Sequence, residues 1–180
     1  MENCMEHIER VQRELKYKGA ILSMYADTIK VPNGNTAVWD FIGHQGAAAV
    51  VPVTDDGKIL MVRQYRNSVD RYTLEIPAGG LNSKDEPTIE AAARELEEET
   101  GYASEHLEPL ISIVTAIAFC DEVIDIYLAT GLKKTQQHLD EDEYIDVYAY
   151  TPQKLADMIY SGKIQDSKTV AAIMAYINRK

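Results

Sequence analysis

The sequence predicts an α/β protein, an α/β/α sandwich around a mixed β-sheet. The first observation is the order of segments: strand-like runs, an acidic helical segment, further strand-like runs and two final helical segments. The second is a pair of turn signals, Asn33-Gly34 and Asp56-Gly57, each between two strand-like runs. The third is size, since 180 residues that are 46% hydrophobic suffice for one domain, or one domain with an extension.

The chain before the acidic helix is expected to contain one short helix and two hairpins. Residues 5–16 are expected to form the helix, and residues 19–31 and 36–42 the strands of the first hairpin, around the turn at 32–35. Three more strands are expected at residues 47–53, 58–66 and 73–79. The turn around Asp56-Gly57 would join the first two of these strands as the second hairpin.

The chain after the acidic helix is expected to hold three strands and two helices. The strands are expected at residues 110–118, 123–132 and 144–151. Thr151 followed by Pro152 is a helix start, an N-cap with proline in the first turn, and this helix is expected to run to about Tyr160. Gly162 ends it, and the final helix is expected over about 166–178.

Composition excludes several classes of partner. The net charge of -11 argues against a nucleic-acid backbone or an anionic membrane surface as the main partner. The cysteines Cys4 and Cys120 are too few for a disulfide framework, and the four histidines lack zinc-site spacing. The charged N-terminal segment has no apolar signal core, and no stretch reaches transmembrane length, so a cytoplasmic location is expected.

The most specific signal lies in residues 80–102, GLNSKDEPTIEAAARELEEETGY. Its fixed points are Gly80, Glu86, Arg94-Glu95-Leu96, Glu98-Glu99 and Gly101-Tyr102. A chance match of this spacing has odds on the order of one in a billion per window.

On a helix over 88–100, the acidic residues of this segment share one side. Glu95, Glu98 and Glu99 lie together, Arg94 can hold Glu98, and an apolar face is expected from Ile89, Ala92, Ala93 and Leu96. Three like charges repel each other unless a cation lies among them, and Mg2+ is the usual cation beside phosphates. The alternative is a solvated acidic face with salt bridges four residues apart.

The spacing GX5EX7REUXEEXGU is that of the Nudix box, and the chain resembles a Nudix hydrolase over roughly residues 45–178. The resemblance implies the Nudix fold, a Mg2+ cofactor with Mn2+ as a substitute, and metal ligation by Glu95, Glu98 and Glu99. It also implies that Glu98 and Glu99 are the catalytic residues of the box. A backbone carbonyl ligand is expected from Ala78 or Gly79, since Gly79-Gly80 leaves the loop register open.

Features outside the box resemble the ADP-ribose pyrophosphatases within this family. Residues 74–79, LEIPAG, resemble their E-x-P-A-G, and residues 64–66 resemble their Q-[FY]-R. This resemblance implies hydrolysis of a nucleoside diphosphate sugar, with ADP-ribose giving AMP and ribose 5-phosphate. It also implies a homodimer whose N-terminal extension, residues 1–44, supplies dimerisation strands beside a hydrolase domain at 45–180.

Four substrate-binding residues are implied by the same resemblance, each with an alternative. Trp39 stacks on the adenine, or lies in the core or a dimer interface; His44 approaches a phosphate, or is a plain loop residue. Arg66 binds a phosphate, or forms a surface salt bridge. Glu75 contacts the ligand or orients Arg66, or is half of a buried structural pair.

The same resemblance implies a glutamate that orients the attacking water, on the acidic loop at 140–143. Both Glu141 and Glu143 fit, and a solvated acidic loop is the alternative. One departure from the subfamily is Ile117-Ala118, where it commonly has proline and glycine. This departure leaves open another nucleotide sugar or a dinucleoside polyphosphate as substrate. The remaining alternative, a non-catalytic nucleotide-binding module, would be expected to lose box carboxylates.

Overall fold

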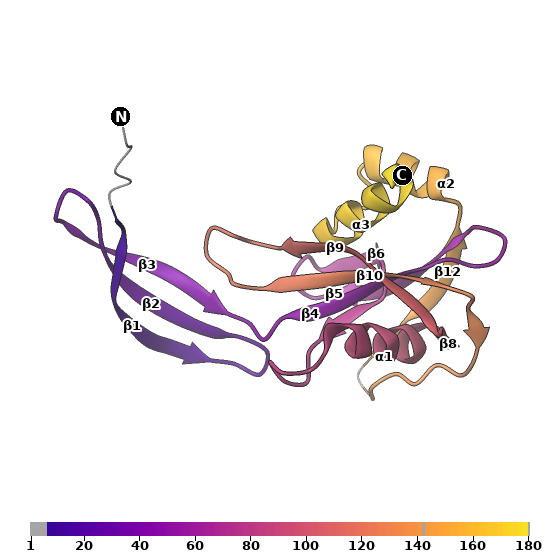
Figure 1. The fold of residues 1–180 in the computed structure, drawn as a ribbon, viewed down its shortest axis with the longest axis horizontal. Coiled ribbons are helices and arrows are strands. Elements are labelled where there is room, and N and C mark those ends of the chain that lie inside the picture. The colour runs from indigo at the N-terminus through magenta and orange to yellow at the C-terminus, as the bar shows by residue number, and fades with distance from the viewer. Residues whose placement is uncertain (1–6, 142, 180) are drawn as a thin grey trace. The chain divides into compact units, whose positions relative to one another are not determined.

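The computed structural model describes residues 7–141 and 143–179 (Figure 1). The chain divides into two compact units. The first contains residues up to Gln45 together with Val114–Glu122. The second contains Gly46–Ile113 and the chain from Val123 onward. In the described part of the chain, no helix has the length and apolar character needed to cross a membrane.

The first unit is built on a three-stranded antiparallel sheet in the order β1-β2-β3. Its strands are β1 (Glu9–Lys18), β2 (Ser23–Lys30) and β3 (Thr36–Gly43). The predicted hairpin is confirmed, and Gly34 in its turn has a φ of +88° and donates its N–H to the Val31 carbonyl at 2.9 Å.

The helix predicted at residues 5–16 is wrong over its described part, because residues from Glu9 onward pair with β2. The ladder extends from the pair Glu9–Lys30 to the pair Lys18–Ser23, with two bulges in β1. This long backbone ladder overrides a helix propensity that is only a weak prior. Residues 5 and 6 lie outside the described residues.

The second unit contains the predicted mixed sheet, in the order β7-β4-β10-β9. Its strands are β7 (Ala78–Gly80), β4 (Ala47–Pro52), β10 (Val123–Thr130) and β9 (His106–Val114). β4 pairs with β10 in parallel and with β7 antiparallel, and all of its residues are buried. A strand buried on both faces explains the unbroken small and apolar run that predicted it.

Another sheet of this unit has the order β12-β5-β6. Its strands are β12 (Asp146–Tyr150), β5 (Ile59–Arg66) and β6 (Arg71–Glu75). The turn of the second predicted hairpin forms, since the Gly57 N–H donates to the Thr54 carbonyl at 2.8 Å and Val53 bridges Ile59. The predicted pairing of the two strands is wrong, because β4 and β5 belong to different sheets. Two short strands that were not predicted, β8 (Tyr102–Ala103) and β11 (Lys133–Lys134), pair with each other.

Helices cover both faces of the β4–β10 pair, as Figure 1 shows, and confirm the α/β/α sandwich. The helices are α1 (Thr88–Thr100), α2 (Pro152–Tyr160) and α3 (Ser167–Asn178). Along β4, Ala48 and Val50 pack toward α1, whereas Ala49 and Val51 belong to the cluster with α2 and α3. This alternation follows from the two-residue period of a strand.

The starts of α2 and α3 carry side-chain caps. Thr151 accepts a hydrogen bond from the Lys154 N–H at 3.3 Å, as its sequence position predicts. Asp166 caps α3 by accepting from the Thr169 N–H at 3.0 Å. The second cap brings Asp166 and Thr169 beside the candidate site.

Candidate active site

The Nudix-box helix is α1, and its bounds are those predicted. Its core-facing residues include Ala91, Ala92 and Leu96, all fully buried, whereas Ile89 remains 40% exposed. The predicted apolar face is therefore rotated slightly, away from Ile89 and toward Ala91. This rotation buries Glu95 and Glu99 in addition to the apolar residues.

The two buried carboxylates of α1 lie against β7. Glu99 accepts a hydrogen bond from the Ala78 N–H at 3.2 Å. A Cβ added at Gly79 would overlap the Glu95 carboxylate, which therefore occupies the space that a side chain at position 79 would fill. Ala78 and Gly79, either of which is expected to supply a backbone metal ligand, thus lie beside Glu95 and Glu99, two of the three predicted metal-binding carboxylates.

Arg94 contacts three carboxylates of the box, those of Glu86, Glu95 and Glu98. Its Nη1 donates to Glu95 at 2.6 Å and to Glu98 at 3.1 Å, and its Nη2 donates to the Gly80 carbonyl at 3.3 Å. Glu86 lies 3.5 Å from Arg94 and accepts from the Asn82 N–H. The predicted Arg94–Glu98 contact is confirmed.

Burial disfavours the negatively charged forms of Glu95 and Glu99. Desolvation, reinforced by the negative charge of Glu95, raises the pKa of Glu99 from 4.5 to about 8. Desolvation also raises the pKa of Glu95, against the opposing effect of Arg94. Glu143 contributes its negative charge to both increases.

The donor set suits a hard divalent cation, because it offers two buried carboxylates, the carboxylate of Glu98 and nearby backbone carbonyl groups. In residues 7–141 and 143–179, no three acidic, histidine or cysteine side chains already converge as a metal site. Glu95 and Glu98 are each hydrogen-bonded to Arg94 through one carboxylate oxygen, Oε1 of Glu95 and Oε2 of Glu98.

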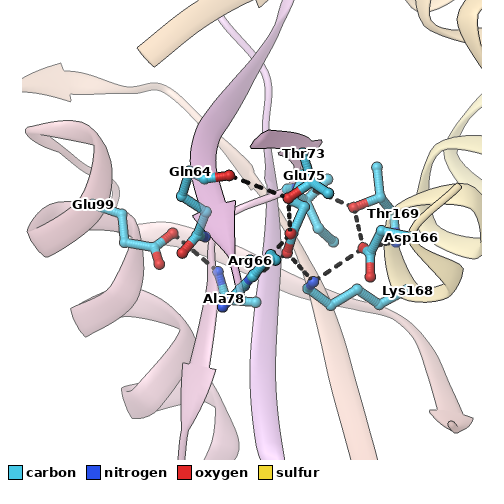
Figure 2. Close-up of polar contacts among 10 residues, drawn as sticks. Gln64, Arg66, Thr73, Glu75, Ala78, Glu99, Asp166, Lys168 and Thr169 are labelled. Atoms are coloured by element: carbon cyan, nitrogen blue, oxygen red, sulfur yellow. Dashed lines mark hydrogen bonds and ion pairs between the residues drawn. The ribbon is translucent and has the colours of Figure 1, made fainter. Parts of the chain in front are cut away.

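Arg66 and Glu75, predicted as substrate-binding residues, form a pair on the adjacent strands β5 and β6 (Figure 2). Arg66 donates from Nε at 2.9 Å and from Nη2 at 2.8 Å, one bond to each oxygen of Glu75. Glu75 also accepts from the Thr73 hydroxyl at 2.6 Å and is 2% exposed. The Arg66 side chain remains 40% exposed.

A group on α3 that sequence reasoning missed completes this cluster. Lys168 Nζ lies 2.5 Å from Glu75 and 3.0 Å from Asp166, and Lys168 is 8% exposed (Figure 2). The Thr169 hydroxyl donates to Asp166 at 2.6 Å and accepts from the Ile76 N–H at 3.0 Å. The helix-capping pattern in Asp166-Ser167-Lys168-Thr169 was the one local signal that could have drawn attention to these residues.

A cavity of about 420 Å³ lies in front of Arg66. The cavity is lined by Gln64, Tyr65, Arg66, Asp140, Glu143 and Tyr144. Of the two candidate loop glutamates, Glu143 lines the cavity and bears on the pKa values of Glu95 and Glu99. Glu141 is exposed.

Trp39 and His44 belong to the first unit. Trp39 lies on β3 opposite Asp27 and is 48% exposed, so it is not part of a core. The His44 N–H donates to Asp121 at 2.8 Å, and its ring lies 3.4 Å from Glu122. Ile117, in the segment that departs from the subfamily, is 84% exposed.

The sequence profile of the NUDIX domain matches residues 43–173, and the chain belongs to this family. It is a Nudix hydrolase with an unbroken box.

Its relatives extend over nearly the whole chain. It is 41% identical to the methanol dehydrogenase activator of Bacillus methanolicus, over 91% of this chain and 89% of that protein. It is 37% identical to the ADP-ribose pyrophosphatase of Bacillus subtilis (strain 168), over the same shares of the two chains. The ADP-ribose pyrophosphatase of Mycobacterium tuberculosis is 35% identical, over 94% of this chain and 84% of its own.

A solved structure described as an ADP compounds hydrolase has the same fold, with a TM-score of 0.83 over 94% of this chain and 92% of that one. At a sequence identity of 20%, this similarity shows the fold alone.

Proposed function

We propose that this protein hydrolyses the pyrophosphate bond of ADP-ribose, with Mg2+ as cofactor, to give AMP and ribose 5-phosphate. The observation that carries the proposal is the grouping, in one unit, of the box carboxylates, the Ala78-Gly79 backbone and an anchored Arg66. The two ADP-ribose pyrophosphatase relatives point to the same substrate.

Each group of this chain has a role in the proposed reaction. Glu95, Glu98 and Glu99, with a carbonyl of Ala78 or Gly79, would hold Mg2+, for which Mn2+ is a substitute. The ion supplies Lewis-acid polarisation of the phosphate oxygens. Arg66 directs its free guanidinium N–H groups at the diphosphate.

Water attack requires a group that receives the proton. Glu143 orients the attacking water and accepts its proton, because it lines the same cavity as Arg66 and a neighbouring carboxylate is the usual base. AMP leaves with one phosphate and ribose 5-phosphate with the other, and the oxygen of water is added to one of them. Trp39 and His44 are proposed to contact the adenine and a phosphate.

The proposal is tested by Mg2+-dependent release of nucleotide products from a panel of ADP-ribose, other nucleotide sugars and dinucleoside polyphosphates, with AMP as the product expected from ADP-ribose. We expect the highest kcat/KM for ADP-ribose and no turnover in EDTA. A higher kcat/KM for another nucleotide sugar or a dinucleoside polyphosphate would replace ADP-ribose as the substrate. Absence of Mg2+-dependent turnover across the panel would reject the proposed reaction.

The choice between the loop glutamates gives a prediction with a built-in control. Glu143→Gln is expected to lower kcat by about 10²-fold or more, as loss of a general base does, with a small change in KM. Glu141→Gln, two residues away and not in the cavity lining, is expected to retain normal kinetics. Single-turnover rates of both variants with saturating Mg2+ check this, and the reverse result would transfer the role to Glu141.

The proposed assembly is a homodimer formed through the strands before residue 45. β1 is an edge strand, and its apolar residues Val11, Leu15 and Tyr17 are 58%, 50% and 61% exposed. Such a row of exposed apolar residues is typical of an interface.

Leu15→Glu is expected to shift the protein from dimer to monomer in sedimentation equilibrium. Tyr160→Glu, which changes an exposed apolar residue on α2, is the matched control and is expected to stay dimeric. A wild-type protein that sediments as a monomer at micromolar concentration would contradict the assembly.

A second candidate function is activation of a dehydrogenase, and the 41% identity to a methanol dehydrogenase activator favours it. The intact box carboxylates mean that such a role would accompany hydrolysis rather than replace it. Addition of the protein, and separately of its Glu99→Gln variant, to a methanol dehydrogenase assay tests this role.

A cytoplasmic location is part of the main proposal, and cell fractionation tests it.

A further inference from the structure

We propose that Lys168, on the first turn of α3, is a positioning residue for hydrolysis, since it fixes the Glu75 carboxylate that holds Arg66 toward the diphosphate. The inference rests on the proposed function, because it gives Arg66 a phosphate to bind. It assigns a catalytic consequence to a helix that contributes none of the box residues.

The Glu75 carboxylate accepts as many hydrogen bonds as its oxygens have lone pairs. Oε1 receives Arg66 Nε and the Thr73 hydroxyl, and Oε2 receives Arg66 Nη2 and Lys168 Nζ. A carboxylate offers about four acceptor sites, so none is left for a ligand. Glu75 therefore acts on the substrate through Arg66 and not by direct contact.

The bidentate contact determines which part of Arg66 is available. Nε and Nη2 are engaged by Glu75, and Nη1 has no hydrogen-bond partner among the described residues. Because Arg66 lines the 420 Å³ cavity, the free N–H groups are available to an anion there. A planar guanidinium that is held along one edge offers its other edge in a fixed orientation.

Lys168 balances the charges that make this orientation stable. The cluster contains two cations, Arg66 and Lys168, and two anions, Glu75 and Asp166. Without the Lys168 ammonium, Arg66 would be the single cation facing two carboxylates. It would then be drawn further toward them and lose its orientation toward a phosphate, while its positive charge would be more fully neutralised by the two carboxylates.

The same helix start also fixes the backbone that leads to the box carboxylates. Thr169, bound to Asp166, receives the Ile76 N–H, and Ala78 two residues later donates to Glu99. Figure 2 shows this row of contacts from Asp166 and Lys168 through Glu75 to Arg66, with Ala78 and Glu99 beside it. The segment from Glu75 to Ala78 is thus held at both ends.

The test is a double-mutant cycle between Lys168→Met and Arg66→Met, with the Kd for ADP in Mg2+ measured by calorimetry and the KM and kcat for ADP-ribose. Lys168→Met alone is expected to raise Kd and KM by roughly tenfold, the effect of one charge-assisted hydrogen bond, and to change kcat less. In the Arg66→Met background it is expected to change Kd by less than about twofold, because the residue through which it acts is gone.

Three further variants separate positioning from other effects. Lys168→Arg retains the charge and a donor and is expected to restore binding to within a few-fold. Lys168→Gln retains a neutral donor and serves if Lys168→Met fails to fold. Lys163→Met, an exposed lysine before the same helix, is the control and is expected to match wild type.

An equal loss of ADP affinity with and without Arg66 would overturn the proposal, since it would show a direct or long-range effect of the ammonium charge. Unchanged ADP binding in a folded Lys168→Met variant would overturn it as well. Wild-type protein that binds ADP and shows the coupling, but does not hydrolyse ADP-ribose, would support the positioning role while rejecting the proposed substrate. Wild-type protein that does not bind ADP would overturn both.

Discussion

Replacement of Glu99 by glutamine is expected to lower kcat with Mg2+ by about 10³-fold, since loss of one ligand charge removes about 4 kcal/mol of transition-state stabilisation. Glutamine keeps an oxygen for the Ala78 N–H, so the fold should be preserved. Glu90→Gln on the exposed face of the same helix is the matched control. Normal turnover of Glu99→Gln in Mg2+ would show that this carboxylate is not a ligand.

The same substitution is expected to stabilise the metal-free protein at pH 8. The pKa of Glu99 is about 8 in the folded chain against 4.5 ordinarily, so the unfolded chain releases its proton first as the pH rises. Stability is therefore lost between about pH 4.5 and pH 8, by an amount on the order of a few kcal/mol. In EDTA, Glu99→Gln is expected to lack this loss and to unfold at a higher urea concentration than wild type at pH 8.

Replacement of Glu75 by alanine is expected to destabilise the fold by about 3–5 kcal/mol at pH 7, because it leaves the buried Lys168 ammonium without one of its two carboxylates. Denaturant unfolding measures this loss. Glu108→Ala, which removes the carboxylate of an exposed pair with Arg179, is the control and is expected to cost less than about 1 kcal/mol. Equal losses for the two variants would mean that burial adds nothing to the Glu75 cluster.

The contribution of Glu75 should also depend on pH. Desolvation opposes its ionisation, but the hydrogen bonds from Arg66 and the charge of Lys168 outweigh it and lower the pKa of Glu75 from 4.5 to about 2. The stabilisation is complete above the unfolded pKa and is lost as the pH falls from about 4.5 to about 2. The stability difference between wild type and Glu75→Gln, measured by urea unfolding, is expected to shrink over this range.

The parts of the fold that the sequence predicts well are those encoded locally. The box residues predict the bounds of α1, and Thr151-Pro152 and Gly162 predict those of α2, because caps and breakers act within a few residues. The error at residues 9–18 has the opposite origin. Their charged, weakly patterned sequence satisfies either secondary structure, and the ladder with β2 decides between them.

The site was predictable where a motif specifies it and not where distant residues meet. Lys168 and Glu75 are separated by 93 positions, and no local spacing links a lysine after a helix cap to a glutamate before Pro77. The two loop glutamates are equivalent in sequence, and the lining of the cavity gives the first reason to prefer Glu143. The roles of these residues remain predictions for the experiments above.

The alanines at the interface between β4 and α1 have a consequence for chemistry. Ala48, Ala91 and Ala92 are completely buried against each other, so the distance between sheet and helix depends on side chains that contain a single methyl group. A larger side chain at any of them would push the helix outward. Glu95 and Glu99 would move with it, away from Ala78 and Gly79, which remain on the sheet. The position of the two carboxylates beside Ala78 and Gly79 therefore limits the size of the side chains at positions 48, 91 and 92.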